Sequence, residues 1–300
     1  MPSFNPAKDI PSLEGKHILV TGATSGLGRQ SVLDLAIHNP SRVYLCGRTV
    51  AKAQQTINEI NLLLPANSTV NISPLALDLS SFASVRAAAA VVLQSSERLD
   101  ILMLNAGIMA VSEGLSKDGY EIQLATNHLS HALLTHLLLP LLQRTSAKFP
   151  GSMPRVVCLS SRGHASAPGL EFDSFKTTAT HLGPYGRYFQ SKLSNVLWVR
   201  YMARKFPEIL FVAIHPGLVQ TSLMDNSDGT PILTRFLTNM AYRFLPTVQT
   251  GAKNQLWGAT ADGVATGEYY EPVGLWGKVC EPGKDDELAL KLGEWTDAQF

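Results

Sequence analysis

Short apolar runs and amphipathic stretches alternate along most of this chain, and the alternation limits the folds that it can adopt. The runs are HILVTG, RVYLCG, NISPLALD, LDILMLNAG, RVVCLSS, ILFVAIHPG and GEYYEPVG, and the amphipathic stretches span residues 26–38, 50–64, 82–95, 119–142 and about 185–206. Such alternation is typical of parallel βαβ units. Because the runs are apolar throughout, both faces of the sheet must be covered. With right-handed crossovers, the sequence predicts a Rossmann-like, doubly wound α/β fold, a seven-stranded parallel sheet with helices on both faces.

Two long segments interrupt this rhythm. A chain of 300 residues can bury one large core, so we expect a single domain over residues 1–300. The segments 162–184 and 221–246 leave the carboxyl ends of strands, where ligands bind in open α/β sheets. Residues 221–246 are rich in Leu, Phe and Met, so we expect them to form a lid over an apolar substrate. The same stretch could instead touch a membrane or a partner subunit.

Composition and charge limit the partners. The formal net charge is +1 and 16% of the residues are charged, which argues against nucleic acid and favours a small, weakly charged ligand. The longest apolar stretch, LSHALLTHLLLPLL, is too short to span a bilayer and is expected to be a buried helix. The N-terminus lacks a signal-peptide core, and three cysteines without CxxC spacing suggest buried thiols, so we expect a cytoplasmic protein.

The stretch TGATSGLG lies between the first predicted strand and the first predicted helix. Gly22 would permit the tight turn, while Gly26 and Gly28 would let the backbone approach a pyrophosphate and let the helix pack on the strand. The helix N-terminus then offers free N–H groups to the phosphates, with Ser25 and Leu27 beside them. The GxxxGxG spacing alone could be a structural turn, but its position favours a nucleotide site.

The end of the second strand indicates which dinucleotide is bound. An acidic residue there would accept hydrogen bonds from the ribose of NAD, but this chain has Arg48, whose guanidinium could bind a 2′-phosphate. NADP(H) is therefore expected, unless Arg48 is simply a solvated surface residue. Asp78 and Leu79, at the end of the third strand, are expected to contact the adenine, although Asp78 could instead cap the following helix.

The sequence YFQSK places Tyr188 and Lys192 one turn apart on a predicted helix. A free tyrosine has a pKa near 10, so its phenolate is too rare at neutral pH to act as a base. A lysine ammonium about 4–5 Å away would stabilise the phenolate by roughly 3–4 kcal/mol at an effective dielectric near 20. The pair therefore suits proton transfer, but the spacing also arises by chance, and neighbouring residues must support it.

Polar residues at three other strand ends or helices give that support. LSS places Ser160 and Ser161 where a hydroxyl could hold a substrate carbonyl, although adjacent serines are also ordinary turn residues. LNAG ends the fourth strand near the expected cofactor ribose. Asn127 lies in an otherwise apolar helix, where its amide must find partners, functional or structural.

Together, TGATSGLG, LNAG, TNHLSH, LSS, YFQSK and HPGLVQT resemble the short-chain dehydrogenase/reductase family, in their order and at the corresponding strand ends. The GR after the second strand and the tail GEYYEPVG look most like its retinol-dehydrogenase-like branch, which includes fungal carbonyl reductases. The resemblance implies catalytic roles for Tyr188 as proton donor or base, Lys192 as its activator and ribose ligand, Ser161 as ligand of the substrate oxygen, and Asn127 as holder of a relay water. It also implies that the nicotinamide and its ribose are bound by Asn105, Ala106, Gly107, Pro216, Gly217, Val219 and Thr221.

The resulting hypothesis is an NADP(H)-dependent oxidoreductase that reduces a ketone or aldehyde of a hydrophobic small molecule, or oxidises the alcohol. A nonenzymatic NADP-binding regulator and an isomerase or cyclase that uses the same cofactor remain alternatives. His128, His131 and His136 share one helix but lack cysteine or carboxylate partners, so no metal is expected. The resemblance also suggests a homodimer or homotetramer.

Overall fold

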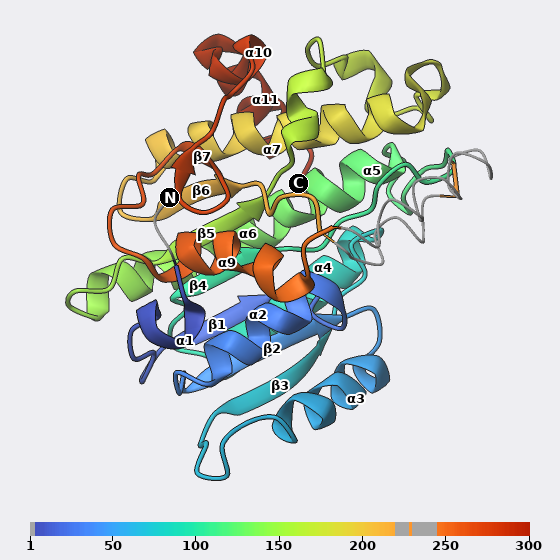
Figure 1. Cartoon of the computed structure of the whole chain (residues 1–300). Helices are drawn as coiled ribbons and strands as arrows, with labels where there is room; N and C mark the ends of the chain where they lie inside the picture. The colour runs from blue at the N-terminus through green and yellow to red at the C-terminus, as the bar shows by residue number, and fades with distance from the viewer. Residues whose placement is uncertain (1–3, 220–227, 230–244) are drawn as a thin grey trace.

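One continuous sheet runs through the protein. The computed structural model describes residues 4–219, 228–229 and 245–300, and its eight strands follow the order β3-β2-β1-β4-β5-β6-β7-β8 (Figure 1). The strands are β1 (His17–Val20), β2 (Arg42–Gly47), β3 (Asn71–Ala76), β4 (Ile101–Leu104), β5 (Arg155–Leu159), β6 (Leu210–Ile214), β7 (Glu268–Glu271) and β8 (Leu275–Trp276). β1 lies between β2 and β4, so the strand order reverses there, as expected of a doubly wound fold.

The sequence predicted seven parallel strands, and the sheet has these seven plus an eighth. The chain turns back after β7, and β8 pairs antiparallel with it through Tyr270 with Trp276 and Glu271 with Leu275. Gly274 supports this return with a φ of +64°. Two residues are too few to show a hydrophobic period, which is why the sequence did not reveal this strand.

Helices cover both faces of the sheet, as Figure 1 shows. The longer ones are α2 (Gly26–Ala36), α3 (Val50–Asn61), α4 (Phe82–Ser95), α6 (Ser130–Lys148), α7 (Gly183–Lys205), α9 (Val248–Thr260) and α11 (Asp286–Asp297). One core packs α4, α6, α7 and α11 against the sheet, and a second packs α2, α3 and α9 against the other face. The expected two-sided burial is therefore confirmed.

Side-chain caps begin most of these helices. Thr49, Ser81, Thr247 and Asp285 each accept a hydrogen bond from a first-turn N–H of α3, α4, α9 and α11. Ser25 occupies the same position before α2 but makes no such bond. The first-turn N–H groups of α2 are therefore uncapped by a side chain.

The continuous helix expected over residues 119–142 is interrupted. Its first part is α5 (Ile122–Leu124), followed by a π-helical turn at Ala125–Leu129 and then by α6. A π turn takes one extra residue, and such turns are frequent at functional sites. The interruption includes Asn127, whose side chain makes the tertiary hydrogen bonds described below, and a periodicity argument detects neither the turn nor these bonds.

The two long segments have different outcomes. The segment 162–184 contains three short 3₁₀ turns, Arg162–Ser166, Phe172–Ser174 and Thr180–Leu182, and its last two residues begin α7. The predicted lid, residues 221–246, lies outside the described residues except for 228–229 and 245–246, as does Thr221.

The cores give a direct stability prediction. Leu102 of β4 is fully buried in the centre of the sheet, whereas Leu62 at the end of α3 is 86% exposed. Leu102→Ala should lower the free energy of unfolding by about 2–5 kcal/mol, because it leaves a cavity. Leu62→Ala, the control, should change it by less than about 0.5 kcal/mol. Urea denaturation measures both, and equal effects would contradict the assignment of the core.

Candidate active site

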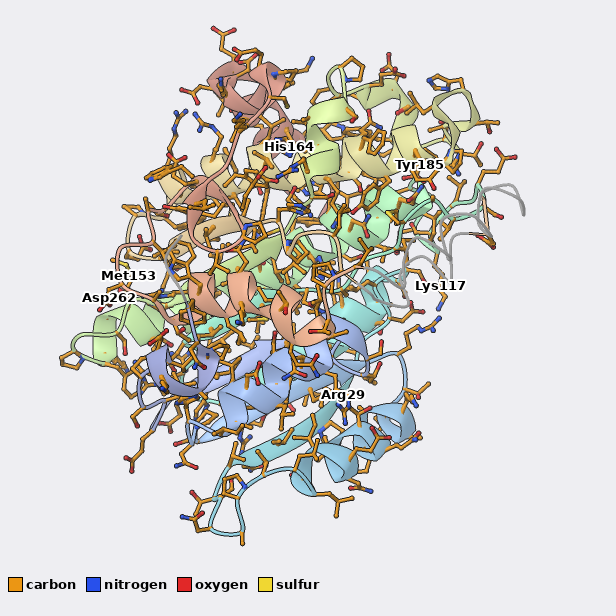
Figure 2. All side chains as sticks on the ribbon, viewed as in Figure 1. Arg29, Lys117, Met153, His164, Tyr185 and Asp262 are labelled. Atoms are coloured by element: carbon orange, nitrogen blue, oxygen red, sulfur yellow. The ribbon has the colours of Figure 1, made fainter. Side chains whose placement is uncertain are left out.

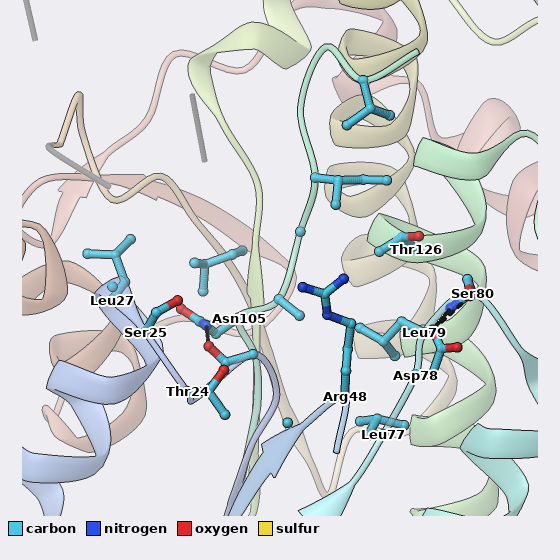
Figure 3. A pocket seen from close by; sticks show the side chains of 18 of the residues that line it. Thr24, Ser25, Leu27, Arg48, Leu77, Asp78, Leu79, Ser80, Asn105 and Thr126 are labelled. Atoms are coloured by element: carbon cyan, nitrogen blue, oxygen red, sulfur yellow. Dashed lines mark hydrogen bonds between the residues drawn. The ribbon is translucent and has the colours of Figure 1, made fainter. Parts of the chain in front are cut away.

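A cavity of about 510 Å³ opens at the point where the strand order reverses. Figure 3 shows its walls, which the ends of β1, β2, β4 and β5 supply together with α7. The residues predicted to bind the cofactor that line it are Gly22, Ser25, Gly26, Leu27, Arg48, Asp78, Leu79, Asn105, Ala106, Gly107, Tyr188, Lys192 and Pro216. The structure thus brings the two halves of the predicted site into one cavity.

Several lining residues were not predicted from the sequence. They are Thr24, Gly47, Leu77, Ser80, Ile108, Val111, Thr126 and Leu159, whereas Ser160, which also lines the cavity, was considered with Ser161 as a ligand of the substrate carbonyl. Most of them adjoin a predicted residue, so extending each motif by one or two positions would have found them. Val111 is the exception, because it lies on an irregular segment after β4.

The glycine loop is shaped by backbone conformation and close packing. Gly22 has a φ of +62°, which favours glycine. Gly28 does not line the cavity, but a Cβ on it would lie 2.5 Å from Asn105 Nδ2 and from the Gly22 carbonyl oxygen. Asn105 Nδ2 also donates to the Thr21 carbonyl at 2.9 Å. The loop is therefore held against the end of β4, with the uncapped N-terminus of α2 facing the cavity.

Next to the glycine loop, at the end of β2, Arg48 has no hydrogen bond or ion pair within the described part of the chain, and Figure 3 shows its guanidinium extending into the cavity. Asp78 accepts hydrogen bonds from Lys117 Nζ at 2.9 Å and from Ser80 Oγ at 2.7 Å. Burial alone would raise the pKa of Asp78, but these hydrogen bonds outweigh it and lower the pKa. Ser81 caps α4, so the alternative that Asp78 is the cap is wrong.

Tyr188 and Lys192 lie on α7, both nearly buried, with Lys192 Nζ 5.6 Å from the centre of the Tyr188 ring. The ammonium donates to the Leu159 carbonyl at 2.9 Å, at the end of β5. Burial lowers the pKa of Lys192 to about 8. A Cβ on Gly107 would lie 3.6 Å from Lys192 Nζ. The absence of a side chain at Gly107 therefore leaves space beside the ammonium.

The two serines after β5 differ in their hydrogen bonds. Ser160 lines the cavity and donates its hydroxyl proton to the Lys192 carbonyl at 2.8 Å. Ser161 caps the first 3₁₀ turn, where its Oγ accepts from Gly163 N at 3.1 Å. A serine hydroxyl has a single proton. Within the described residues, the Ser161 proton has no acceptor and can be donated, whereas that of Ser160 is already used.

Asn127 does not line the cavity, and its side chain braces the segment after LNAG. Its Oδ1 accepts from Ile108 N at 2.8 Å, and its Nδ2 donates to Ile108 O and Ser191 Oγ, both at 2.9 Å. The Asn127 amide thus makes structural hydrogen bonds, the alternative to a functional role that the sequence left open.

A second set of contacts, not predicted from the sequence, holds the same segment. Arg187 Nη2 donates to the Val111 carbonyl at 2.8 Å, and Arg187 Nε lies 3.3 Å from Glu121 Oε1, outside hydrogen-bond geometry. Gln123 Oε1 accepts from Ala110 N at 2.9 Å. The cavity wall is therefore fixed by buried polar side chains of α5 and α7.

The HPG turn after β6 reaches the cavity through Pro216. Gly217 has a φ of +89°, and Val219 is buried against Gly251 of α9. Neither lines the cavity.

Comparison with known proteins gives the family. The family model described as short chain dehydrogenase matches residues 16–167, which is half of the chain. The chain belongs to this family. An uncharacterized oxidoreductase from Schizosaccharomyces pombe is 34% identical over 97% of this chain and 87% of its own length. Retinol dehydrogenase 13 from Homo sapiens is 30% identical over 96% of this chain and 84% of its own length. An oxidoreductase from Neurospora crassa, named mitochondrial, is 31% identical over 96% of this chain and 72% of its own length.

Solved structures confirm the fold. An uncharacterized protein from Mycobacterium paratuberculosis superposes with a TM-score of 0.75 at 27% identity, covering 99% of this chain and 97% of that one. A 3-ketoacyl-(acyl-carrier-protein) reductase from Brucella melitensis, complexed with NADH, has a TM-score of 0.64 at 22% identity and covers 88% and 98%. A short-chain dehydrogenase from Shigella flexneri, complexed with NADP, has a TM-score of 0.65 at 21% identity and covers 87% and 98%. The chain is an oxidoreductase of the short-chain dehydrogenase family.

Two of the three histidines singled out in this short-chain dehydrogenase are buried hydrogen-bonding groups. His128 bonds Asn195 and Thr296, and His131 bonds Thr21 and the Asn127 carbonyl. Among the described residues, no group of three His, Cys, Asp or Glu side chains could hold a metal ion. Of the helices described, none has both the length and the apolar character needed to cross a membrane.

These two histidines predict a loss of stability in acid. Burial lowers the pKa of His128 to about 4 and that of His131 to about 3. The unfolded chain therefore binds protons near pH 6.5 that the folded protein does not bind, and stability falls as the pH drops below 6.5. Between pH 6.5 and 4.5 each ring should cost about 2 kcal/mol of unfolding free energy.

Urea denaturation at the two pH values tests this. His131→Gln should be less stable at pH 6.5 but should lose about 2 kcal/mol less than the wild type on acidification. The same pH dependence in both proteins would contradict the assignment of a neutral buried ring.

Proposed function

We propose that this protein is an NADP(H)-dependent oxidoreductase that reduces the carbonyl of a hydrophobic ketone or aldehyde, or oxidises the corresponding alcohol. The observation that carries the proposal is that Tyr188 and Lys192 share one cavity with the glycine loop and the uncapped end of α2. A possible proton donor, Tyr188, therefore lines the same cavity as a loop and a helix N-terminus that are suited to bind a dinucleotide.

The residues of the cavity fit such a cofactor. The first-turn N–H groups of α2 can bind a pyrophosphate, because Ser25 leaves them uncapped. Arg48, without a partner in the described part of the chain, can bind a 2′-phosphate through forked donors. When bound, NADPH supplies the hydride. The preference for NADP over NAD rests on Arg48 and on the lack of a carboxylate at the end of β2, where Gly47 is the last residue.

The chain's own residues supply the proton and orient the carbonyl. Tyr188 donates its hydroxyl proton to the carbonyl oxygen, and the nearby Lys192 ammonium stabilises the phenolate that remains. Ser161 donates its free proton to the same oxygen and fixes its position. Asn127 keeps Ile108 and the adjoining wall of the cavity in place.

The substrate is proposed to be apolar. Ile108 and Val111 line the cavity beside Tyr188, and neither introduces a charge. The similarity to retinol dehydrogenase 13, whose name specifies a hydrophobic alcohol, supports the same class. A cytoplasmic location is part of the proposal, supported by three free cysteines, of which Cys46 and Cys158 are buried.

Replacement of the proposed proton donor tests the chemistry. Tyr188→Phe should lower kcat for NADPH-dependent reduction of apolar ketones and aldehydes by about 10²–10⁴-fold, because the proton donor is lost. Its affinity for NADPH should change little. Tyr201→Phe is the matched control, since the Tyr201 hydroxyl lies further along the same helix and donates to Asp297.

The assay follows NADPH absorbance, and fluorescence titration gives the affinity. Tight NADPH binding without turnover of any carbonyl would contradict the reductase and favour a binding protein or another reaction. Equal activity of Tyr188→Phe and wild type would exclude Tyr188 as the proton donor.

The choice of cofactor is tested at Arg48. Arg48→Ala should weaken NADPH binding about tenfold or more, because a charge-assisted hydrogen bond to the 2′-phosphate is removed, and should leave NADH binding nearly unchanged. Arg29→Ala on α2, which loses only a partly exposed ion pair with Glu59, is the control (Figure 2). A wild type that prefers NADH would show that Arg48 does not select the cofactor.

A further inference from the structure

We propose that Asn195 is a positioning residue for Lys192: its amide shares the Leu159 carbonyl with the Lys192 ammonium and locks the main chain of Asn127 beside it. This inference rests on the proposed function. Asn195 lies three residues after Lys192 on α7, so both side chains leave the same side of the helix. It is 1% exposed, and no part of it lines the cavity.

The first part of the argument is the carbonyl that the two side chains share. Lys192 Nζ lies 2.9 Å and Asn195 Nδ2 lies 3.0 Å from the Leu159 oxygen. A carbonyl oxygen has two lone pairs, and these two donors occupy both of them. Without Asn195, the Leu159 oxygen would accept only the hydrogen bond from Lys192. The position of Lys192 Nζ would then be less sharply defined.

The second part is the main chain of Asn127. Its carbonyl oxygen accepts from Asn195 Nδ2 at 3.1 Å and from His131 Nδ1 at 3.2 Å. Both lone pairs are again used. Asn195 and His131 therefore hold this main-chain oxygen from two sides, next to the Lys192 ammonium.

The third part is the orientation of the Asn195 amide. Both of its N–H groups point at carbonyl oxygens, so Oδ1 must be the atom that faces His128 Nδ1, at 3.3 Å. His128 therefore carries its proton on Nδ1 and accepts from Thr296 Oγ1 at Nε2, 3.1 Å away. His131 also carries its proton on Nδ1, because that atom faces a carbonyl, and its Nε2 accepts from Thr21 Oγ1 at 2.9 Å.

Every hydrogen bond in this network therefore pairs one donor with one acceptor. Lys192 is the charged group of the network. Burial keeps both rings neutral by lowering the pKa of each. Asn195, His128 and His131 thus fix the position of the ammonium while remaining neutral. They add no second charge that would shift the pKa of the Tyr188 hydroxyl.

The variants separate the donor function of Asn195 from its volume. Asn195→Leu removes both donors at similar size. Asn195→Asp keeps the shape and the acceptor for His128 but replaces the donating NH₂ by an oxygen. Ser194→Ala is the control, because this neighbouring buried hydroxyl only donates to Gln190 O within α7.

In the NADPH-dependent carbonyl assay, Asn195→Leu should lower kcat at least tenfold, with KM for the carbonyl and Kd for NADPH within threefold of wild type. Asn195→Asp should show the same loss at pH 8. Ser194→Ala should retain wild-type kcat.

Nitrogen-15 NMR of the histidine rings provides a readout that needs no turnover. Wild type should show His128 and His131 as Nδ1–H tautomers, and Asn195→Leu should change the signals of His128 but not the tautomer of His131. Nε2–H tautomers in wild type would overturn the proposed network. If the tautomers are as expected and wild type turns over, but Asn195→Leu keeps its kcat, only this inference fails. If wild type consumes no NADPH, the proposed function fails, and the positioning role of Asn195 fails with it.

Discussion

The burial of parallel strands on both faces is the constraint on which the rest of the structure depends. In strands such as β4 and β6 every side chain is buried, so helices must cover both faces of the sheet. The chain can cover both sides only by winding outward in two directions from β1 and β4. The two loops that leave these neighbouring strands diverge, and the cavity lies between them.

Polar groups at this crevice are satisfied mainly by other protein groups. The segment after β4 is held by the amides of Asn127 and Gln123 and by Arg187, and the ammonium of Lys192 is held by a main-chain carbonyl. An unpaired polar group in such surroundings would be costly, so each partner restricts the others. The rigidity of the site therefore comes from hydrogen bonds between segments that are distant in sequence.

The sequence was sufficient for features that depend on local pattern. The continuous apolar runs predicted the parallel strands, and Gly22, Arg48 and Lys192 were placed in one cavity because the carboxyl ends of parallel strands meet at one edge. Features that depend on tertiary partners were not predictable in this way. The π turn at Asn127 was not expected, and the hydrogen bond between Asn195 and Asn127 joins residues 68 positions apart, so hydrophobic period carries no information about either. β8 was not predicted from the sequence because it is only two residues long.

The hydrogen bond between His128 and Thr296 also has a consequence for how the protein is made. The two residues are 168 positions apart, on the π turn before α6 and on α11. Without α11, His128 Nε2 lacks the Thr296 hydroxyl as its partner. The network around the lysine therefore includes a residue of α11, and it is complete only in a chain that has been synthesised as far as Thr296.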